Sequence, residues 1–318
     1  MADRNRKTKL SIIGAGNVGS HIAVYAAGKD LADIVLLDRN ADKARGIGLD
    51  ITQAMAMANN DRVVTGTGDY ADTADSDVVV ITAGLARKPG MSRDDLLEAN
   101  AAIVRSVTRA AVKQSPGCVL VVVTNPVNTM AQLAYEVSGL PRERIIGVSG
   151  VLDSARFKAF IAEELSVGAS RVDAMVLGDH GAQMVPLVDH CLVDGVPIRE
   201  LMSQEQIAAI VDRVRHGGSE IVELLKTGSA YYAPGTATVE LLECILKDRQ
   251  VTLPCAVYLE REYGVDGLYV GVPALIGAGG VEKVIRLHLS ETEQRDFDLS
   301  VVHIRERLDT LRSKAREA

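Results

Sequence analysis

Residues 10–19, with the sequence LSIIGAGNVG, join a short apolar run to a glycine-rich turn and the start of a helix-period pattern. Gly14 allows the tight turn, and the missing side chain at Gly16 lets a pyrophosphate group approach the backbone. Gly19 lets the helix pack closely on the strand, while the helix N-terminus presents unpaired N–H groups to phosphates. A G-x-G-x-x-G pattern alone is weak evidence, but its position between a strand and a helix predicts a dinucleotide-binding fold.

Five further apolar runs extend this pattern through the first half of the chain. They are rich in Val and Ile and nearly continuous, which is typical of parallel strands that are buried on both faces. Together with the first, the six runs are Leu10–Ile13, Ile34–Leu37, Val63–Thr65, Val78–Thr82, Val119–Val123 and Ile145–Val148. Because helix-period segments separate the runs, we expect an α/β protein with an N-terminal Rossmann domain, a doubly wound parallel sheet.

The pattern changes after about Gly150, where short strands and turns replace the regular alternation. A long helix is expected from about Ile198 to Leu225, with a kink at the Gly217–Gly218 pair. The last helix is expected to begin at Ser290, where Glu293 completes a capping box. Its apolar positions form one stripe for docking on the core: Phe297, Val301, Ile304, Leu308 and Leu311.

A chain of 318 residues is long enough for about two domains. We expect residues 1–148 to form the NAD-binding Rossmann domain and residues 149–318 to form an α+β substrate domain. The net charge of −7 and the scarcity of aromatic residues argue against a nucleic acid or a membrane surface as partner. No apolar stretch approaches the roughly 18 residues that a membrane-spanning helix needs.

The cysteines and the N-terminal residues indicate a reducing compartment. Cys118, Cys191, Cys244 and Cys255 are widely spaced, and no CxxC pair suggests a metal site or a redox dithiol. We expect four buried thiols and no metal cofactor. The N-terminal segment MADRNRKTKL lacks the apolar segment of a cleavable presequence, so a cytoplasmic location is expected.

Asp38 ends the second apolar run, 19 residues after Gly19. A carboxylate at that place can accept hydrogen bonds from a ribose 2′-hydroxyl, and it would repel a 2′-phosphate. NAD is therefore expected in preference to NADP. The neighbouring Arg39 weakens this preference, since an arginine can also bind a phosphate.

Of the six histidines, only His180 lies at a glycine-flanked strand end, within the segment GDHG. At such a place a side chain can project into a cleft, and a neutral imidazole suits the removal of a hydroxyl proton near pH 7. A lone histidine is more often structural, so the charged residues elsewhere in the chain decide whether His180 is a candidate base.

Those charged and polar residues occur in three other segments. Arg87 and Arg93 flank the loop ARKPGMSR after the fourth apolar run, at the sheet edge where open α/β folds bind ligands. Arg156 follows Asp153 by three residues, so both would share one face of a helix. Asn125 lies in the segment TNPVN at the end of the fifth run. Taken singly, these residues also fit a solvated basic loop, a simple ion pair and a turn-forming asparagine.

In combination, these residues resemble the lactate/malate dehydrogenase family, most closely its lactate-dehydrogenase-like branch of malate dehydrogenases. The resemblance covers essentially the whole chain. It rests on motifs in the family's order and spacing: GAGNVG, the strand-end Asp38, ARKPGMSRDDLL, VTNPVN, GVLDSARF, GDHGAQMVPL and GSAYYAPG. This set is far more specific than any single motif.

The resemblance implies a role for each candidate in the reaction. His180 resembles the family's catalytic base, and Asp153 resembles the carboxylate that orients it. Arg156 resembles the residue that clamps the C1 carboxylate of the substrate. Arg93 resembles the cation that polarises the reacting C–O bond, and Asn125 resembles a contact shared by substrate and cofactor. The implied cofactor-binding positions are Asp38, Asn100, Val123, Asn125 and the loop residues Gly14, Ala15, Gly16, Asn17, Val18 and Gly19.

Arg87 is the residue that the resemblance links to substrate choice. Lactate-specific members typically carry Gln at this position, whereas malate-specific members carry Arg. The physical chemistry agrees, because a second carboxylate pairs with a desolvated guanidinium, whereas a methyl group would leave the cation unpaired. Ala230, where the lactate enzymes usually have Thr, also favours malate.

The resemblance therefore implies an NAD-dependent malate dehydrogenase of the tricarboxylic acid cycle, which reversibly oxidises (S)-malate to oxaloacetate. A homotetramer is implied, with a dimer as the alternative assembly. A lactate or other 2-hydroxy acid dehydrogenase remains the alternative activity. Two more distant alternatives are an NAD-dependent glycosidase, whose metal-binding Cys and His cluster is not visible here, and a non-catalytic NAD-binding sensor.

Overall fold

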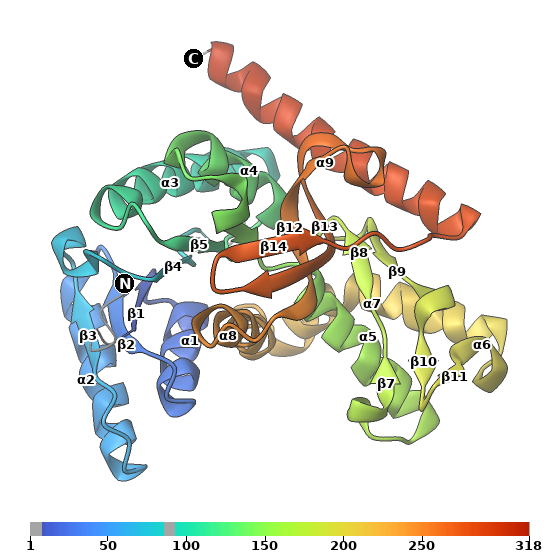
Figure 1. Ribbon diagram of the computed structural model, residues 1–318, viewed down its shortest axis with the longest axis horizontal. Helices are drawn as coiled ribbons and strands as arrows, with labels where there is room; N and C mark the ends of the chain where they lie inside the picture. The colour runs from blue at the N-terminus through green and yellow to red at the C-terminus, as the bar shows by residue number, and fades with distance from the viewer. Residues whose placement is uncertain (1–7, 86–92, 318) are drawn as a thin grey trace.

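The computed structural model describes residues 8–85 and 93–317, and it confirms an α/β protein built on a mostly parallel sheet (Figure 1). The parallel strands are β1 (Lys9–Ile13), β2 (Asp33–Leu37), β3 (Val64–Thr67), β4 (Val78–Ile81), β5 (Val119–Val122) and β6 (Ile145–Gly147). Each lies within two residues of the expected bounds. Their order is β3-β2-β1-β4-β5-β6, so the chain returns beside β1 to build the second half of this doubly wound sheet.

The parallel strands are buried on both faces. In β1, Ile12 belongs to the hydrophobic cluster on one side of the sheet, and Ile13 belongs to the cluster on the other. The helices that cover the two faces, in pairs, are α1 (Asn17–Gly28) with α2 (Ala41–Met57), and α3 (Arg93–Gln114) with α4 (Val127–Ser138). Burial on both faces explains why the apolar runs are continuous instead of alternating.

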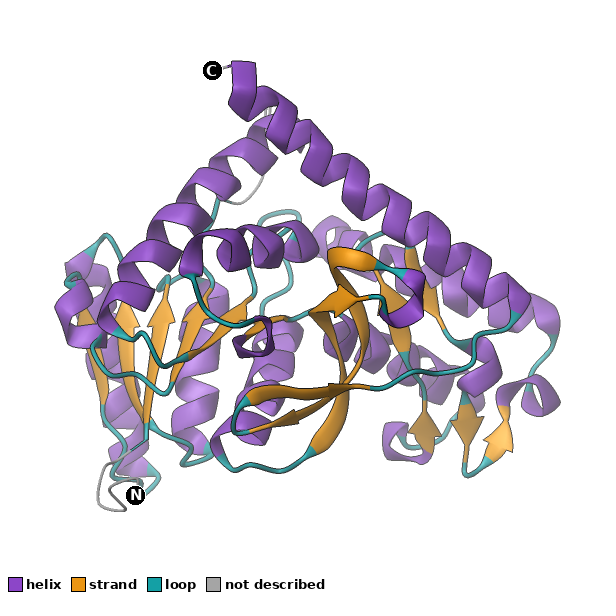
Figure 2. Ribbon diagram, turned by 45° about the horizontal axis from the view of Figure 1, so that its top comes forward, coloured by secondary structure: helices purple, strands orange, loops and turns teal. Residues whose placement is uncertain are grey.

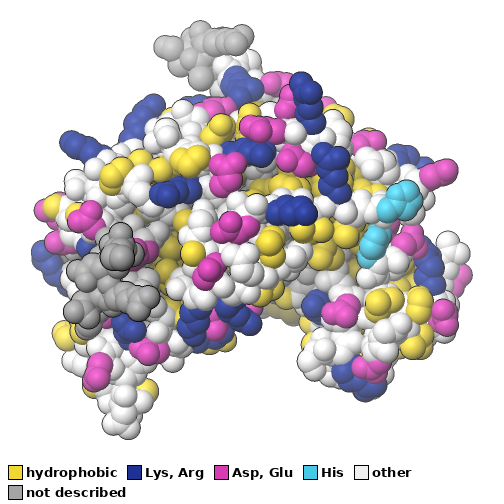
Figure 3. All heavy atoms as spheres, in the orientation of Figure 1, with side chains coloured by type: hydrophobic (Ala, Val, Ile, Leu, Met, Phe, Trp, Pro, Cys, Tyr) yellow, Lys and Arg dark blue, Asp and Glu magenta, His cyan; other side chains and the backbone are white. Residues whose placement is uncertain are grey.

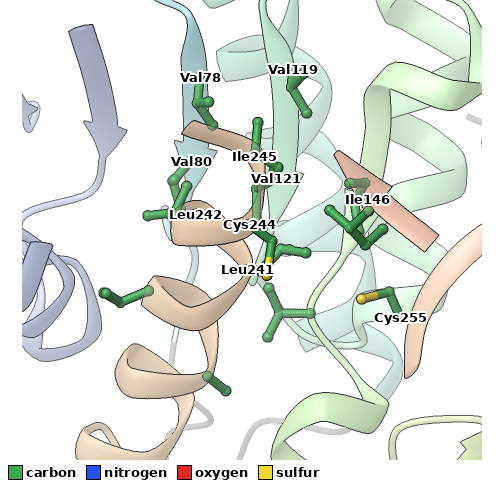
Figure 4. Packing of buried hydrophobic residues seen from close by; sticks show 14 of the residues in the cluster. Val78, Val80, Val119, Val121, Ile146, Leu241, Leu242, Cys244, Ile245 and Cys255 are labelled. Carbon is green, nitrogen blue, oxygen red and sulfur yellow. The ribbon is translucent and has the colours of Figure 1, made fainter. Parts of the chain in front are cut away.

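A helix from the second half of the chain completes the core of the first half. This helix, α8 (Tyr232–Leu246), lies against the face that α1 and α2 cover. Figure 4 shows Leu242 and Ile245 of α8 beside Val80 of β4 and Val121 of β5. The two halves therefore share one core and pack closely.

The sheet continues into the second half of the chain through antiparallel strands. Gly147 of β6 lies opposite Ala256, and the order runs on as β12-β13-β8-β9, with β14 beside β13. These strands are β8 (Val176–Gly178), β9 (Met184–Pro186), β12 (Val251–Glu260), β13 (Asp266–Gly277) and β14 (Gly280–Val284). A small separate sheet contains β7 (Val172–Asp173), β10 (Leu192–Val193) and β11 (Val196–Pro197).

The helices of the second half surround these strands (Figure 1). Besides α8, they are α5 (Gly150–Leu165), α6 (Ile198–Leu201), α7 (Gln204–Leu225) and α9 (Glu291–Glu317). Single turns of 3-10 helix occur at η1 (Tyr70–Thr73), η2 (Arg142–Arg144), η3 (Ala169–Arg171), η4 (Val188–His190) and η5 (Glu262–Gly264).

The prediction of one helix from Ile198 to Leu225 with a kink at Gly217–Gly218 is wrong in two respects. The break lies at Met202 and Ser203, between α6 and α7, because Ser203 and Gln206 form a capping box that starts a new helix. Through the Gly217–Gly218 pair, where a kink was expected, α7 is continuous. A Cβ at Gly217 would lie 3.3 Å from Cδ of Arg156, so the missing side chain makes room for that arginine.

The last helix follows its sequence pattern. Ser290 and Glu293 form the expected capping box, with the Ser290 N–H donating to the Glu293 carboxylate at 3.0 Å. The apolar stripe from Phe297 to Leu311 is buried. Figure 2 shows that α9 runs from the second half of the chain to a point near the start of α3. There Lys314 pairs with Glu98 of α3 at 2.6 Å.

The four cysteines are buried and free, as the sequence predicted. In the part of the chain that the structure describes, no helix has the length and apolar character of a membrane span. Figure 3 shows acidic and basic side chains interspersed over one face of the molecule.

Candidate active site

The glycine-rich loop lies at the carboxyl edge of the parallel sheet, between β1 and α1. Gly14 has a φ of +114°, and a Cβ there would lie 2.7 Å from Oγ1 of Thr82. A Cβ on Gly19 would collide with the carbonyl oxygen of Gly14, so the close approach of helix and strand depends on this glycine. At Gly16, by contrast, a Cβ would meet no described atom within 4 Å. The loop is thus tightly built behind Gly16 and open in front of it, which fits a pyrophosphate group.

Asp38 lies beside this loop, at the end of β2. The Ala15 N–H donates to Oδ2 of Asp38 at 2.8 Å, and the Asn40 N–H donates to Oδ1 at 2.9 Å. These bonds hold the carboxylate next to the glycine loop, where it can accept from a ribose hydroxyl.

Thr82, at the end of β4, supports the loop from behind, a role that the sequence analysis missed. Its hydroxyl donates to the Gly14 carbonyl at 2.9 Å. The parallel register places Ile13 opposite Ile81, so Thr82 directly follows the strand residue beside the glycine turn. That position, one residue past a strand end, was the available signal. Val123, at the end of β5, lies along the same edge, and its N–H donates to the Ile81 carbonyl at 2.9 Å.

Asn100 joins three segments of this edge. From α3, its Oδ1 accepts from the Leu85 N–H at 2.7 Å, and its Nδ2 donates to the Asn125 carbonyl at 2.9 Å. The side chain therefore connects the end of β5 to the segment that enters the loop with the candidate arginines. Of those, Arg87 lies outside the described residues. Arg93 is the first residue of α3, and its side chain also lies outside the described part.

The second half of the chain supplies a compact charged cluster. Asp153 and Arg156 share one face of α5, and His180 directly follows β8 and Asp179. Nδ1 of His180 lies 2.7 Å from Oδ2 of Asp153, and Nη1 of Arg156 donates to Oδ1 of Asp153 at 3.0 Å. Asp153 is buried, while the other two side chains remain 14–15% exposed. One carboxylate thus orients both an imidazole and a guanidinium toward solvent-accessible space.

The environment of His180 favours its protonated form. Burial of the ring lowers the pKa of His180, but the charge of Asp153 and the hydrogen bond to it raise the pKa. Arg156 lowers the pKa and Asp179 raises it, and the balance places the pKa above the ordinary value of 6.5. An imidazole of this kind can both accept and donate a proton near neutral pH.

Arg156 carries an unused hydrogen-bond donor. Its buried Nε has no hydrogen-bond partner among the described residues. Its Nη1 donates to Asp153, and the side chain remains 14% exposed, so a further acceptor can approach the guanidinium. A carboxylate is the group that best matches the geometry of a guanidinium.

Asn128 positions the backbone of His180, and the sequence analysis assigned it no role. Its Oδ1 accepts from the His180 N–H at 3.2 Å, and its Nδ2 donates to the Tyr269 carbonyl at 3.3 Å. Asn128 lies in the same TNPVN segment as Asn125, which follows β5 at the carboxyl edge of the sheet. The segment therefore links the sheet edge of the first half to the backbone of His180 in the second. The motif was visible in the sequence, but its partner 52 residues away was not.

The cluster can perform acid–base chemistry on a substrate that carries a carboxylate. In residues 8–85 and 93–317, no three His, Cys, Asp or Glu side chains gather in a group that could hold a metal ion. Neither described cavity contains the cluster. One lies along α3 beside Arg105, Arg109 and Lys113, and the other lies at the amino-terminal side of the sheet near Lys9.

Two protein-family models match consecutive parts of the chain. The NAD-binding domain of lactate/malate dehydrogenases matches residues 8–147, and the alpha/beta C-terminal domain of the same enzymes matches residues 150–315.

Individual relatives match over nearly their full length. A malate dehydrogenase from Desulforudis audaxviator is 50% identical over 300 residues, which cover 94% of this chain and 97% of that protein. The structure of malate dehydrogenase from Salinibacter ruber has a TM-score of 0.93 at 44% identity and covers 98% of this chain and 99% of its own. A lactate dehydrogenase from Cryptosporidium parvum, complexed with lactic acid and nicotinamide adenine dinucleotide, has a TM-score of 0.93 at 40% identity, covering 96% of this chain and 98% of its own.

Proposed function

The chain belongs to the lactate/malate dehydrogenase family, and from this premise we propose that it catalyses the reversible, NAD-dependent oxidation of (S)-malate to oxaloacetate. The observation that carries the proposal is the Asp153–His180–Arg156 cluster, in which one buried carboxylate orients an acid–base group and a carboxylate-binding group. Relatives named malate dehydrogenase, at about half identity over nearly full length, support malate as the substrate.

His180 moves the proton in this proposal. Because Nδ1 faces Asp153, Nε2 is the nitrogen that takes the proton from the C2 hydroxyl of malate. Asp153 keeps the ring in this orientation and stabilises the imidazolium that forms. In the reverse direction, the protonated ring returns this proton to the oxygen of oxaloacetate.

The cofactor site is proposed at the carboxyl edge of the sheet. The loop from Gly14 to Gly19 would hold the pyrophosphate, and Asp38 would hold the adenosine ribose. Asn100, Val123 and Asn125 remain the further proposed contacts. When bound there, NAD supplies the hydride acceptor, and the contact of Asn128 with His180 supports a cofactor site close to the acid–base group.

Three arginines would each contact a different part of the substrate. Arg156 would bind the C1 carboxylate through its guanidinium, since its side chain is partly exposed beside the acid–base group. Arg87 would bind the second carboxylate, and Arg93 would polarise the carbonyl of oxaloacetate. The roles of Arg87 and Arg93 rest on the family resemblance, since neither side chain is among those described. Water exclusion around these cations would strengthen each charge contact.

The test of this function is NADH consumption with oxaloacetate compared with pyruvate. The wild-type protein is expected to prefer oxaloacetate by orders of magnitude in kcat/KM. In Arg87→Gln, the ratio of the two kcat/KM values should shift toward pyruvate by roughly 10- to 100-fold, because a charge-assisted bond worth ~1.5–3 kcal/mol is lost. An unchanged ratio would remove Arg87 from substrate selection, and a wild-type preference for pyruvate would identify a lactate dehydrogenase instead.

We also propose residues 1–148 as the cofactor domain and residues 149–318 as the substrate domain, in a cytoplasmic protein. The four buried, free cysteines support a reducing compartment. A homotetramer is proposed, with a dimer as the alternative. Exposed apolar side chains on α2, α7 and α8, such as Met57, Leu224 and Tyr232, support subunit association. Sedimentation equilibrium should give about four times 33.9 kDa, and a mass of one chain would contradict any such assembly.

A further inference from the structure

Asp179 is a buried carboxylate for which the proposed reaction has no use. It lies between Gly178, the last residue of β8, and His180, and its side chain is only 1% exposed. Both of its oxygens accept from Nη1 of Arg307 on α9, at 2.9 and 2.8 Å. An unpaired carboxylate at this depth would be costly, so Arg307 is the cation that makes its burial possible.

A second contact from α9 holds the same strand end. The Asp179 N–H donates to Oγ of Ser300 at 2.6 Å. Gly178 has a φ of +84°, and a Cβ on it would collide with that hydroxyl. Ser300 and Arg307 lie on one side of α9, seven residues apart. Ser300 therefore binds the backbone of Asp179, while Arg307 binds its carboxylate. With Asn128 on the other side, the segment that carries His180 is fixed from two helices.

The charged groups around the imidazole come from three elements. α5 contributes Asp153 and Arg156, and the strand end contributes Asp179. α4 contributes the uncharged Asn128. From α9, Arg307 faces Asp179.

Behind Arg307 lies a second layer of titratable groups on α9. Nη2 of Arg307 donates to Nε2 of His303 at 2.9 Å, and Nδ1 of His303 lies 3.8 Å from Glu306. Because a guanidinium is only a donor, His303 must accept through an unprotonated Nε2 in this arrangement.

We propose that Arg307 is a positioning residue for His180, which acts through Asp179: it fixes the strand end that carries the imidazole and offsets the negative charge beside it. The proposal rests on the proposed function, because it takes His180 as the acid–base group. The charge of Asp179 raises the pKa of His180. Removal of the Arg307 cation should therefore leave that carboxylate uncompensated and raise the pKa of His180 further.

The test is the pH profile of Arg307→Gln, measured in both reaction directions. Malate oxidation needs neutral His180, so its acidic limb should move to higher pH by roughly 0.5–1 unit. Oxaloacetate reduction needs protonated His180, so its alkaline limb should move upward by the same amount. Arg307→Lys keeps the charge and should restore both limbs. The matched control is Arg305→Gln, which removes one charge from an exposed position of the same helix and should leave both limbs in place.

The pKa of His180 can also be measured directly, without an activity assay. The imidazole titration of His180 in the cofactor-free protein, followed by NMR and assigned by its absence in His180→Ala, should show the same upward shift in Arg307→Gln. If this variant does not fold, Asp179→Asn supplies the opposite test, because loss of the carboxylate should move both limbs and the titration downward. Suppose that Arg307→Gln folds, that both limbs of the pH profile stay in place, and that the rate falls equally in both directions. That result would mean that Arg307 only supports the fold.

The proposed function and this inference fail in different ways. If the wild-type protein does not interconvert malate and oxaloacetate, or if His180→Ala retains normal turnover, the proposed function is wrong. If the wild-type protein is active through His180 and the limbs do not respond to Arg307→Gln, the function stands and only the role of Arg307 is wrong.

Discussion

Replacement of His180 by Ala is expected to lower kcat for malate oxidation by more than ~100-fold, and by up to about 10⁴-fold, because positioned general bases contribute factors of this size. The variant loses an imidazole whose Nδ1 lies 2.7 Å from Oδ2 of the buried Asp153. NAD binding should persist, since the cofactor loop and Asp38 lie in the other half of the chain. Steady-state kinetics together with calorimetric titration of NAD separate the two effects.

The matched control for this variant is His216→Ala. His216 lies on α7 with an exposed side chain and should tolerate the change without loss of turnover. Near-normal kcat in His180→Ala would exclude His180 as the acid–base group. Loss of NAD binding in the same variant would show that the substitution disturbs the fold instead of the chemistry.

The pH profile of the wild-type protein also tests the assignment of His180 as the acid–base group. The pKa of His180 lies above 6.5 because the charge of Asp153 and the hydrogen bond to it outweigh the effect of burial. Malate oxidation, which uses the neutral ring, should therefore decline on the acidic side at a pH above 6.5. Oxaloacetate reduction, which uses the protonated ring, should persist to higher pH than an unperturbed histidine allows.

Replacement of Arg156 by Leu is expected to lower kcat/KM for oxaloacetate by roughly 10²- to 10³-fold. The change leaves the substrate carboxylate without its guanidinium partner and leaves the buried Asp153 without one of its two partners, a loss worth ~3–5 kcal/mol. Because Arg156 would bind the carboxylate in the ground state and the transition state alike, most of the effect should appear in KM. A smaller fall in kcat is expected, since Asp153 also orients His180.

Two further variants test whether this effect is specific to the guanidinium of Arg156. Arg156→Lys keeps the charge but loses the planar fork, so its activity should lie between the wild type and Arg156→Leu. Arg171→Gln removes a guanidinium that is about half exposed and pairs with Asp194, and it should change neither constant by more than about twofold. An unchanged KM in Arg156→Leu would mean that Arg156 does not bind the substrate carboxylate.

Much of this site was predictable because its parts have local sequence signals. A strand, a glycine turn and a helix follow one another within residues 10–28, and Asp38 lies at the next strand end. Asp153 and Arg156 are three residues apart, so a helix alone brings them to one face. The capping box at Ser290 likewise needs only residues close in sequence.

The contacts that the sequence did not predict join residues far apart in the chain. Asn128 and His180 are 52 residues apart, and Asp179 and Arg307 are 128 apart. No periodicity or spacing marks such pairs, because they form only when separate helices pack on one strand end. The glycine pair in α7 shows the same limit. A local rule predicted a kink at Gly217–Gly218, but the packed structure uses the missing side chain of Gly217 to make room for Arg156.

The sequence by itself determined the doubly wound sheet, the glycine loop and the chemical types of the candidate groups, because backbone preferences and burial patterns act over short stretches of chain. Only the tertiary structure decided which of those groups meet. It placed α8 beneath the sheet of the other half, and it brought α5 and α9 to the strand end of His180. These meetings depend on how distant apolar faces bury one another, which is a property of the whole folded chain.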